Sequence, residues 1–313
     1  MIPVLDKSAY LERLLGAPRP NIEKILAFYE HRVGAICTEG GVMLSPLDDH
    51  MFHRGDGVFE AMKFVSGRIY QFDEHMARMK KSASSIRLAP PLAWEDVPAI
   101  VLETVRAAGV KTGTLRVFLG RGPGGFGVDP SECPQSSFYV VASKWAPYPE
   151  SWYEKGLRGF KSSMPPRPAQ TSHIKDTNYL FAVMMTMEAR ERGLDTPFVF
   201  DGEGCLAESA VANICLVDKA GVLVVPEFTH ALPGTTIRRT MELLEGKVEC
   251  VIRRVPEEEI FEAAELLLLG TSPNCAAIVE YEGKKIGDGK RGPVARLLNG
   301  LIEEDIAHNG LAF

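Results

Sequence analysis

The stretch SHIKDTNYL, residues 172–180, places a lysine between a bulky apolar residue and the expected start of a helix. Asp176 or Thr177 could cap that helix. Apolar side chains then recur at helical spacing, at Tyr179, Leu180, Val183, Met184 and Met187. Two interpretations of Lys175 stay open. It is either a surface lysine whose stem passes Ile174, or a partly desolvated amine of lowered pKa, as Schiff-base chemistry requires.

The composition of the chain limits the classes of function. Its 313 residues are 45% hydrophobic and 24% charged, which is ordinary for a globular protein with room for two domains. The formal net charge is −6 and no block of Lys and Arg occurs. We therefore expect neither a nucleic-acid nor a membrane partner. With no apolar stretch of about 18 residues and no basic region before an apolar N-terminal core, we expect a cytoplasmic protein.

Cysteine and histidine patterns do not indicate a metal. The six cysteines form no CxxC pair, and several lie in apolar runs, so we expect reduced thiols. The cluster DDHMFH, residues 48–53, matches no spacing typical of metal ligands. No metal site is predicted.

A change of pattern divides the chain near residue 150. Helix-like and strand-like runs alternate up to residue 145, and the next segment, APYPESWYEKG, carries two prolines with little periodicity. Strand-rich runs separated by turns follow it. We expect an α/β (α+β) fold with a smaller N-terminal α+β domain (1–145), a linker (146–156) and a larger C-terminal α/β domain (157–313).

Local signals add three expectations within the first domain. A hairpin is predicted around Gly40 and Gly41, and a strand turn at Ser66 and Gly67. Asp73 is a plausible cap for the helix that follows.

Two glycine patterns fit the dinucleotide-binding fingerprint GxGxxG, at residues 120–125 and 287–292. The first runs into Pro130 and Pro134, which prevent the required helix, and the second has no following strand. The sequence therefore does not predict a Rossmann enzyme.

The segment LPGTTIRRTMELL, residues 232–244, is a better candidate for an anion site. Gly234 allows close backbone approach, and Thr235 and Thr236 add hydroxyls at a helix N-terminus. Free N–H groups and the helix dipole both favour a phosphate there. The alternative is a simple threonine N-cap after a turn.

A second loop offers similar groups. LLLLGTSPN, residues 266–274, reads as a buried strand that delivers Gly270, Thr271 and Ser272 to its end. Ligands in α/β domains bind at strand ends.

Glu208, within GCLAESAVANICLV, is flanked by small and apolar residues on an expected strand. It is either an exposed hairpin residue or an acid that faces a cation inside a site, because an unpaired buried carboxylate is unfavourable. A protonated pyridine nitrogen is such a cation. Together, a lysine, phosphate-binding threonines and this acid are what pyridoxal 5'-phosphate requires.

Seven motifs in order give the chain a family resemblance over nearly its whole length: GDGVFEAMKF, FDEHMARMKKSA, IKDTNYL, CLAESAVANICLV, LPGTTIRRTMEL, GTSPN and IGDGKRGPV. The chain resembles the fold-type IV pyridoxal-phosphate enzymes, which comprise branched-chain aminotransferases, D-amino acid aminotransferases and aminodeoxychorismate lyases. The resemblance implies pyridoxal 5'-phosphate as cofactor, amino acid and 2-oxo acid substrates, and a homodimer with sites near the subunit interface.

The resemblance also implies roles for individual residues. Lys175 would form the internal aldimine and move the substrate proton, and Glu208 would keep the pyridine nitrogen protonated. Arg78, Thr236 and Thr271 match phosphate-binding residues, to which the residue pattern adds Gly234 and Thr235.

Residues expected near the substrate match the family less well. Tyr179 stands where branched-chain enzymes have an active-site tyrosine, but four residues after the lysine instead of five. Arg116 is what remains of their Y-[IF]-R-P strand, and Ser272 is a further candidate for substrate binding. Ile237 stands where their GITR motif has arginine.

The substrate is therefore open. FLGRGPGGFGVDP, residues 118–130, resembles the glycine-rich loop of branched-chain enzymes, whereas Arg121 is present without the histidine that D-amino acid enzymes would favour. We expect transfer of an amino group from a branched-chain L-amino acid to 2-oxoglutarate. The alternatives are a D-amino acid aminotransferase and a 4-amino-4-deoxychorismate lyase.

Overall fold

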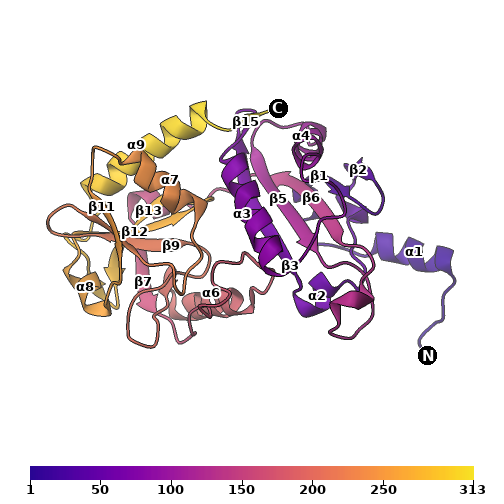
Figure 1. The fold of residues 1–313 in the computed structure, drawn as a ribbon, viewed down its shortest axis with the longest axis horizontal. Coiled ribbons are helices and arrows are strands. Elements are labelled where there is room, and N and C mark those ends of the chain that lie inside the picture. The colour runs from indigo at the N-terminus through magenta and orange to yellow at the C-terminus, as the bar shows by residue number, and fades with distance from the viewer.

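The computed structural model describes all 313 residues and contains two β-sheets, each packed against its own helices (Figure 1). The first sheet consists of β1 (Ile25–Glu30), β2 (Ala35–Cys37), β3 (Gly57–Val65), β4 (Arg68–Ile69), β5 (Gly113–Gly120), β6 (Ser137–Lys144) and β15 (Leu311–Ala312). The second consists of β7 (Leu157–Lys161), β8 (Thr196–Phe198), β9 (Asn213–Val217), β10 (Leu223–Pro226), β11 (Cys250–Arg253), β12 (Glu265–Gly270), β13 (Asn274–Tyr281) and β14 (Lys284–Lys285). This arrangement confirms the expected α/β fold class.

The first sheet is antiparallel throughout, in the order β15-β4-β3-β5-β6-β1-β2. Helices α3 (Phe72–Ser85) and α4 (Val97–Ala107) pack on it and close a core of 21 buried residues. The core includes Ile174, which belongs to the lysine-bearing segment. That segment is therefore anchored to the first sheet by its apolar neighbour.

The second sheet is mixed, in the order β11-β10-β9-β12-β13-β7-β8. Its strands are buried on both faces, because alternate residues of β12 enter different cores. Leu266 and Leu268 lie in one core, and Leu267 and Leu269 lie in the other. The continuous apolar run at this strand thus follows from coverage of both faces, by α8 (Glu257–Glu262) on one and by α7 (Thr235–Leu243) and α9 (Pro293–His308) on the other.

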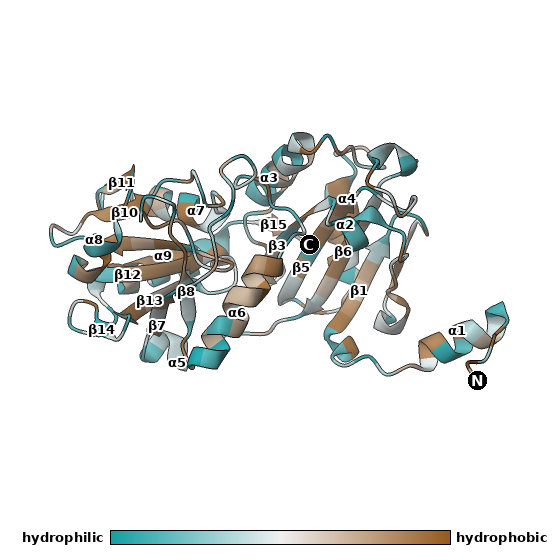
Figure 2. Cartoon of the chain, turned by 90° about the horizontal axis from the view of Figure 1, so that it is seen from below, coloured by the Kyte–Doolittle hydropathy of each residue, from teal (hydrophilic) through white to brown (hydrophobic).

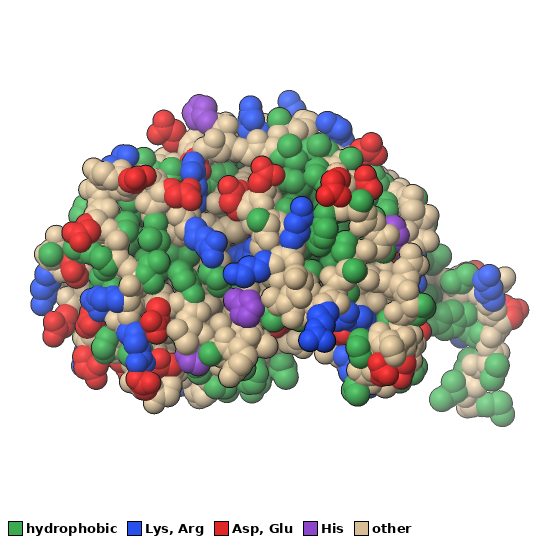
Figure 3. Space-filling view, in the orientation of Figure 1, with side chains coloured by type: hydrophobic (Ala, Val, Ile, Leu, Met, Phe, Trp, Pro, Cys, Tyr) green, Lys and Arg blue, Asp and Glu red, His purple; other side chains and the backbone are tan.

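The first half of the molecule, built on the first sheet, and the second half, built on the second sheet, meet as one continuous body. Lys and Arg side chains gather near the middle of the face in Figure 3. Helix α1 (Lys7–Gly16) projects from this body and buries none of its residues. None of the helices is long and apolar enough to cross a lipid bilayer. The remaining helical elements are α2 (His50–Arg54), α5 (Ser151–Glu154), α6 (Leu180–Arg192), and the 3-10 turns at Ile22–Lys24, Gly40–Val42 and Pro130–Glu132.

We propose that the domains are residues 1–145 and 157–313, joined by residues 146–156. The chain leaves the first sheet after Lys144 and enters the second sheet at Leu157. The short helix α5 lies in the segment between them. The C-terminal strand β15 returns to pair with β4, so the end of the chain packs on the first sheet.

Several local predictions can now be judged. The turn at Ser66 and Gly67 is confirmed, with φ of 50° and 81° between β3 and β4. The hairpin around Gly40 and Gly41 is wrong, because β1 pairs with β2 and those glycines form a 3-10 turn. Asp73 is not the cap of α3, which begins one residue earlier after Gln71.

Candidate active site

A cavity of about 740 Å³ lies between the two sheets, within the range typical of small-molecule sites. Its walls come from β3, α3 and β5 of the first half and from the loops, α7 and β12 of the second. The structure brings all ten predicted site residues to this one cavity: Arg78, Arg116, Lys175, Tyr179, Glu208, Gly234, Thr235, Thr236, Thr271 and Ser272.

Lys175 lies in the segment before α6 and is held there by its backbone. Its N–H donates to Ser82 Oγ at 3.1 Å, and its carbonyl accepts from Phe59 N at 3.0 Å. The Nζ donates to Tyr179 Oη at 2.8 Å and lies 4.5 Å from the centre of the Phe59 ring. The amine therefore faces an aromatic wall and has one polar partner in the cavity.

The helix after Lys175 begins later than predicted. α6 starts at Leu180 with Tyr179 at its N-cap, and no side chain caps it. Asp176 accepts from Asn178 N, and Thr177 donates to Gly55 O, so the expectation that either residue caps the helix is wrong. The Thr177 side chain holds the lysine segment against the first half, and the Asp176 side chain forms a turn within that segment.

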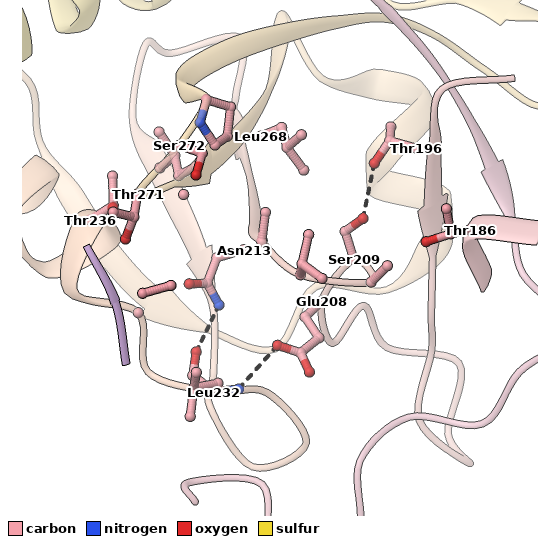
Figure 4. A pocket seen from close by; sticks show the side chains of 18 of the residues that line it. Thr186, Thr196, Glu208, Ser209, Asn213, Leu232, Thr236, Leu268, Thr271 and Ser272 are labelled. Carbon is pink, nitrogen blue, oxygen red and sulfur yellow. Dashed lines mark hydrogen bonds between the residues drawn. The ribbon is translucent and has the colours of Figure 1, made fainter. Parts of the chain in front are cut away.

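Glu208 lies in a loop before β9, so its predicted place on a strand is wrong. Its side chain is buried and points into the cavity, as Figure 4 shows. Oε1 accepts from Arg167 Nε at 2.9 Å, and Oε2 accepts from Leu232 N at 3.1 Å. Burial raises the pKa of Glu208 to about 7, although Arg167, the Leu232 N–H and Lys175 all favour the anion.

Arg167 is a site residue that sequence reasoning missed. Besides Glu208, its guanidinium contacts Ile174 O at 3.4 Å and lies 5.6 Å from the centre of the Tyr179 ring. The available signal was an arginine in a proline-rich segment, MPPRPAQ, just ahead of the lysine. Arg167 thus stands between the acid and the aromatic residue that contacts Lys175.

The N-terminus of α7 lines the cavity and carries the groups predicted for an anion site. Gly234 is the N-cap and Thr235 and Thr236 are the first helical residues, so the alternative of a threonine N-cap is excluded. A Cβ atom at Gly234 would clash with Asn213 Oδ1, which explains the glycine. Thr236 and Thr271, both labelled in Figure 4, line the cavity, and their hydroxyls make no hydrogen bond within the protein. Two unpaired hydroxyls beside uncapped N–H groups suit a phosphate.

Arg78 is held by a buried network that the sequence did not reveal. Its Nε and Nη2 donate to the two oxygens of Glu60 at 2.8 and 2.7 Å. His75 contacts Glu60 through Nδ1 at 2.6 Å and Thr235 Oγ1 through Nε2 at 3.3 Å. Burial would raise the pKa of Glu60, but Arg78 and His75 together lower it to about 2. An ionised Glu60 therefore fixes Arg78 beside the start of α7.

Two further arginines line the cavity, and their guanidinium groups make no ion pair or hydrogen bond within the chain. They are Arg116 on β5 and Arg190 on α6. Arg121 differs, because it does not line the cavity and donates to both oxygens of Asp56, at 2.8 and 3.0 Å. Arg116 and Arg190 are thus the cations available to a substrate carboxylate.

These walls fit pyridoxal 5'-phosphate. An amine (Lys175), a buried acid (Glu208) and an anion site (Thr236 and Thr271) face one cavity from different elements. The cofactor needs these three groups for its aldehyde, its ring nitrogen and its phosphate.

Comparison with known proteins agrees with this fit. Residues 57–281 match the family model for amino-transferase class IV. The D-amino-acid transaminase, chloroplastic, of Arabidopsis thaliana is 33% identical, over 97% of this chain and 82% of that protein. A putative branched-chain-amino-acid aminotransferase of Methanocaldococcus jannaschii is 28% identical, over 80% of this chain and 87% of that protein.

A solved structure shares the fold across almost the whole chain. The T.th. branched-chain amino acid aminotransferase, complexed with N-(5'-phosphopyridoxyl)-L-glutamate, superposes with a TM-score of 0.84 at 26% identity. The match covers 91% of this chain and 96% of that one. The ligand of that structure joins a phosphopyridoxyl group to an amino acid. This chain therefore belongs to the class IV aminotransferase family and is a pyridoxal-phosphate enzyme.

Proposed function

We propose that this enzyme transfers the amino group of a D-amino acid to a 2-oxo acid such as 2-oxoglutarate. The observation that carries the proposal is the 33% identity to the D-amino-acid transaminase over 97% of the chain. The branched-chain relative is 28% identical over 80%. Arg116 and Arg190, both unpaired in the cavity, support a substrate with two carboxylates.

When bound, pyridoxal 5'-phosphate would supply an aldehyde reactive toward amines and a ring able to accept an electron pair. The chain's own groups then have separate tasks in this proposal. Lys175 moves the proton at the α-carbon, and Tyr179 orients its Nζ through the 2.8 Å hydrogen bond. Glu208 holds the proton on the ring nitrogen, while Arg167 orients the carboxylate.

The second candidate is the branched-chain L-amino acid reaction that the sequence favoured. It is supported by the TM-score of 0.84 to a branched-chain enzyme and by the glycine-rich loop at residues 118–130. The departures at residues 114–117 and at Ile237 weigh against it. The lyase alternative would use the same Lys175 and needs no amino acceptor.

The visible absorption band of the purified enzyme tests the proposal. D-alanine or D-glutamate, added without an acceptor, is expected to remove the band of the bound cofactor, whereas L-leucine leaves it unchanged. Loss of the band with L-leucine alone would establish the branched-chain reaction instead. Pyruvate released from aminodeoxychorismate without an acceptor would identify the lyase. Lys175→Ala serves as the control, and it should release no 2-oxo acid or pyruvate from any of these compounds.

We also propose that a second copy of the chain covers α6. Five large apolar side chains of this helix are exposed: Leu180, Phe181, Val183, Met184 and Met187. Figure 2 colours the N-terminal half of α6 as hydrophobic. The residues that α6 buries against the rest of the chain are Ala182, Met185 and Ala189. Contiguous exposed apolar residues mark interfaces, and this face begins five residues after Lys175.

Light scattering after size exclusion measures the oligomeric state. We expect a dimer for the native enzyme and a monomer for the double variant Val183→Glu/Met184→Glu. Glu191→Lys, on an exposed polar position of the same helix, is the control and should remain dimeric. A double variant that stays dimeric would place the interface elsewhere.

A further inference from the structure

The turn that carries Thr271 and Ser272 is a tight connection between two central strands. Gly270 at the end of β12 pairs with Asn274 at the start of β13, so only three residues, 271–273, lie between them. Asn274 has a φ of 57°, in the left-handed region that asparagine adopts more readily than most residues. Such a conformation persists when surrounding contacts hold it.

Lys63 supplies one of those contacts from the other half of the molecule. It lies on β3 of the first sheet and is 2% exposed. Its Nζ donates to Asn274 Oδ1 and lies 5.2 Å from the centre of the Tyr70 ring. No carboxylate forms an ion pair with the Lys63 amine, and Asn274 is the sole hydrogen-bond partner of that amine. Burial lowers the pKa of Lys63 to about 7.

A second donor reaches the same turn from the segment between the sheets. Tyr153 of α5 donates its hydroxyl to Pro273 O at 3.1 Å. Both side chains that donate hydrogen bonds to residues 271–274 therefore come from outside the second sheet. The turn belongs to one sheet by sequence and is held by the other half and by the linker.

Lys63 does not line the cavity, so it can act there only through Asn274. We propose that Lys63 is a positioning residue for the cofactor phosphate, which fixes the turn bearing Thr271 and thereby links cofactor binding to the packing of the two halves. The inference rests on the proposed role of Thr271 in holding the phosphate. A buried lysine with a single amide partner is otherwise unfavourable, and a positioning role accounts for it.

A turn that is already ordered binds an anion without a further loss of conformational entropy. Without the Lys63 contact, Asn274 can leave the left-handed region, and the Thr271 hydroxyl then loses its fixed place in the cavity wall. The loss should concern the phosphate end of the cofactor and should leave the Lys175 end unchanged.

Apoenzyme titrations with pyridoxal 5'-phosphate and with pyridoxal, which lacks the phosphate, separate these ends. For Lys63→Met we expect the dissociation constant of pyridoxal 5'-phosphate to rise about ten-fold, while that of pyridoxal changes less than about two-fold. Asn274→Gly keeps the left-handed backbone and removes the acceptor, so it should show the same selective loss. Because both variants remove the same hydrogen bond, the double variant should lose no more affinity for pyridoxal 5'-phosphate than either single variant.

Equal weakening of both ligands would show a general structural role and overturn the inference, as would independent, additive losses in the double variant. Asn274→Gly keeps the test valid if Lys63→Met does not fold. Thr271→Val tests the underlying assignment separately. If Thr271→Val weakens pyridoxal 5'-phosphate selectively and Lys63→Met does not, the role of Lys63 falls and that of Thr271 stands. If Thr271→Val has no effect, the phosphate assignment itself fails.

Discussion

Lys175 is the residue on which the proposed chemistry depends most directly. Its Nζ has one hydrogen bond, to Tyr179, and its backbone position is fixed by Ser82 and Phe59. Lys175→Ala should therefore leave the fold intact while lowering kcat by more than about 10³-fold, since both the covalent and the proton-transfer roles are lost. Steady-state transamination and thermal unfolding measure the two effects. Substantial residual turnover in a folded variant would refute the role of this amine.

The pair of Glu208 and Arg167 predicts a pH dependence of cofactor binding. Burial raises the pKa of Glu208 to about 7 when its partners are Arg167, the Leu232 N–H and Lys175. A protonated ring nitrogen needs the carboxylate anion, so affinity should fall as the pH drops below about 7. Arg167→Met removes a cation that favours the anion, which should move this midpoint to higher pH.

The dissociation constant of pyridoxal 5'-phosphate, measured from about pH 5.5 to 8.5, checks this expectation. Glu208→Gln is the matched control, because it cannot titrate and reveals what the phosphate itself contributes. An unchanged midpoint in Arg167→Met would mean that the guanidinium does not control the charge of Glu208.

At the level of elements, a buried glutamate caps the C-terminal helix α9. Glu265, at the start of β12, accepts from Val294 N at 2.8 Å and from Ala295 N at 2.9 Å. These are first-turn N–H groups, which Gly292 as N-cap cannot satisfy with a side chain. A Cβ at Gly292 would clash with the Glu265 side chain, so the glycine makes room for the cap.

Glu265→Ala should lower the free energy of unfolding by about 2 kcal/mol, as expected for a lost charged cap in a buried setting. Glu265→Gln keeps one acceptor and should lose less. Chemical denaturation measures the free energy of unfolding of both variants. Their cofactor spectra should be unchanged. Equal stability of the alanine variant and the native enzyme would show that water or another group satisfies α9.

Sequence pattern predicted where helices and strands occur better than it predicted which of their residues are exposed or which distant residues they contact. The leucine run at 266–269 was readable as a buried strand, because a continuous apolar run is a local property of the sequence. Glu208 was misplaced on a strand, since its loop is fixed by Arg167 and Leu232, which lie 41 and 24 residues away. The helical spacing after Lys175 was correct, but no local signal indicates that its apolar face is exposed.

The same distinction holds for the site. Lys175, Glu208, Thr236 and Thr271 could be proposed from residue type and neighbours, and the structure brings them to one cavity. Glu60 and His75 could not, because their importance comes from a buried network between β3 and α3 that reaches α7. Polar networks that join distant elements leave little trace in sequence pattern.

At the scale of the whole molecule, a few polar contacts join the two halves. Tyr70 donates to Asp305 of α9 at 2.6 Å, Gln71 donates to Thr235 O at 3.3 Å, and Lys63 contacts Asn274. Because Lys63 is buried without a counter-ion, its charged form opposes folding. The pH dependence of stability should therefore report on this junction.

The sign follows from proton counting. The ordinary pKa of lysine is 10.5, and burial lowers that of Lys63 to about 7. Below pH 7 the amine is charged in both states and the full desolvation penalty applies. Between the two values the unfolded chain binds more protons than the fold, so this group's contribution to stability rises with pH, by at most about 1.4 kcal/mol per pH unit. Buried acids such as Cys275, whose pKa burial raises, act in the opposite direction above about pH 9.

The difference in unfolding free energy between the native enzyme and Lys63→Met cancels the effect of those acids. We expect native minus variant to increase from pH 7 to pH 9, measured by denaturation of the apoenzymes. At pH 6 the variant should come close to the native stability or exceed it, because methionine fills the site without a charge. A difference that stays constant across this range would mean that the Lys63 amine keeps its ordinary pKa, and that water or a shift between the halves relieves its burial.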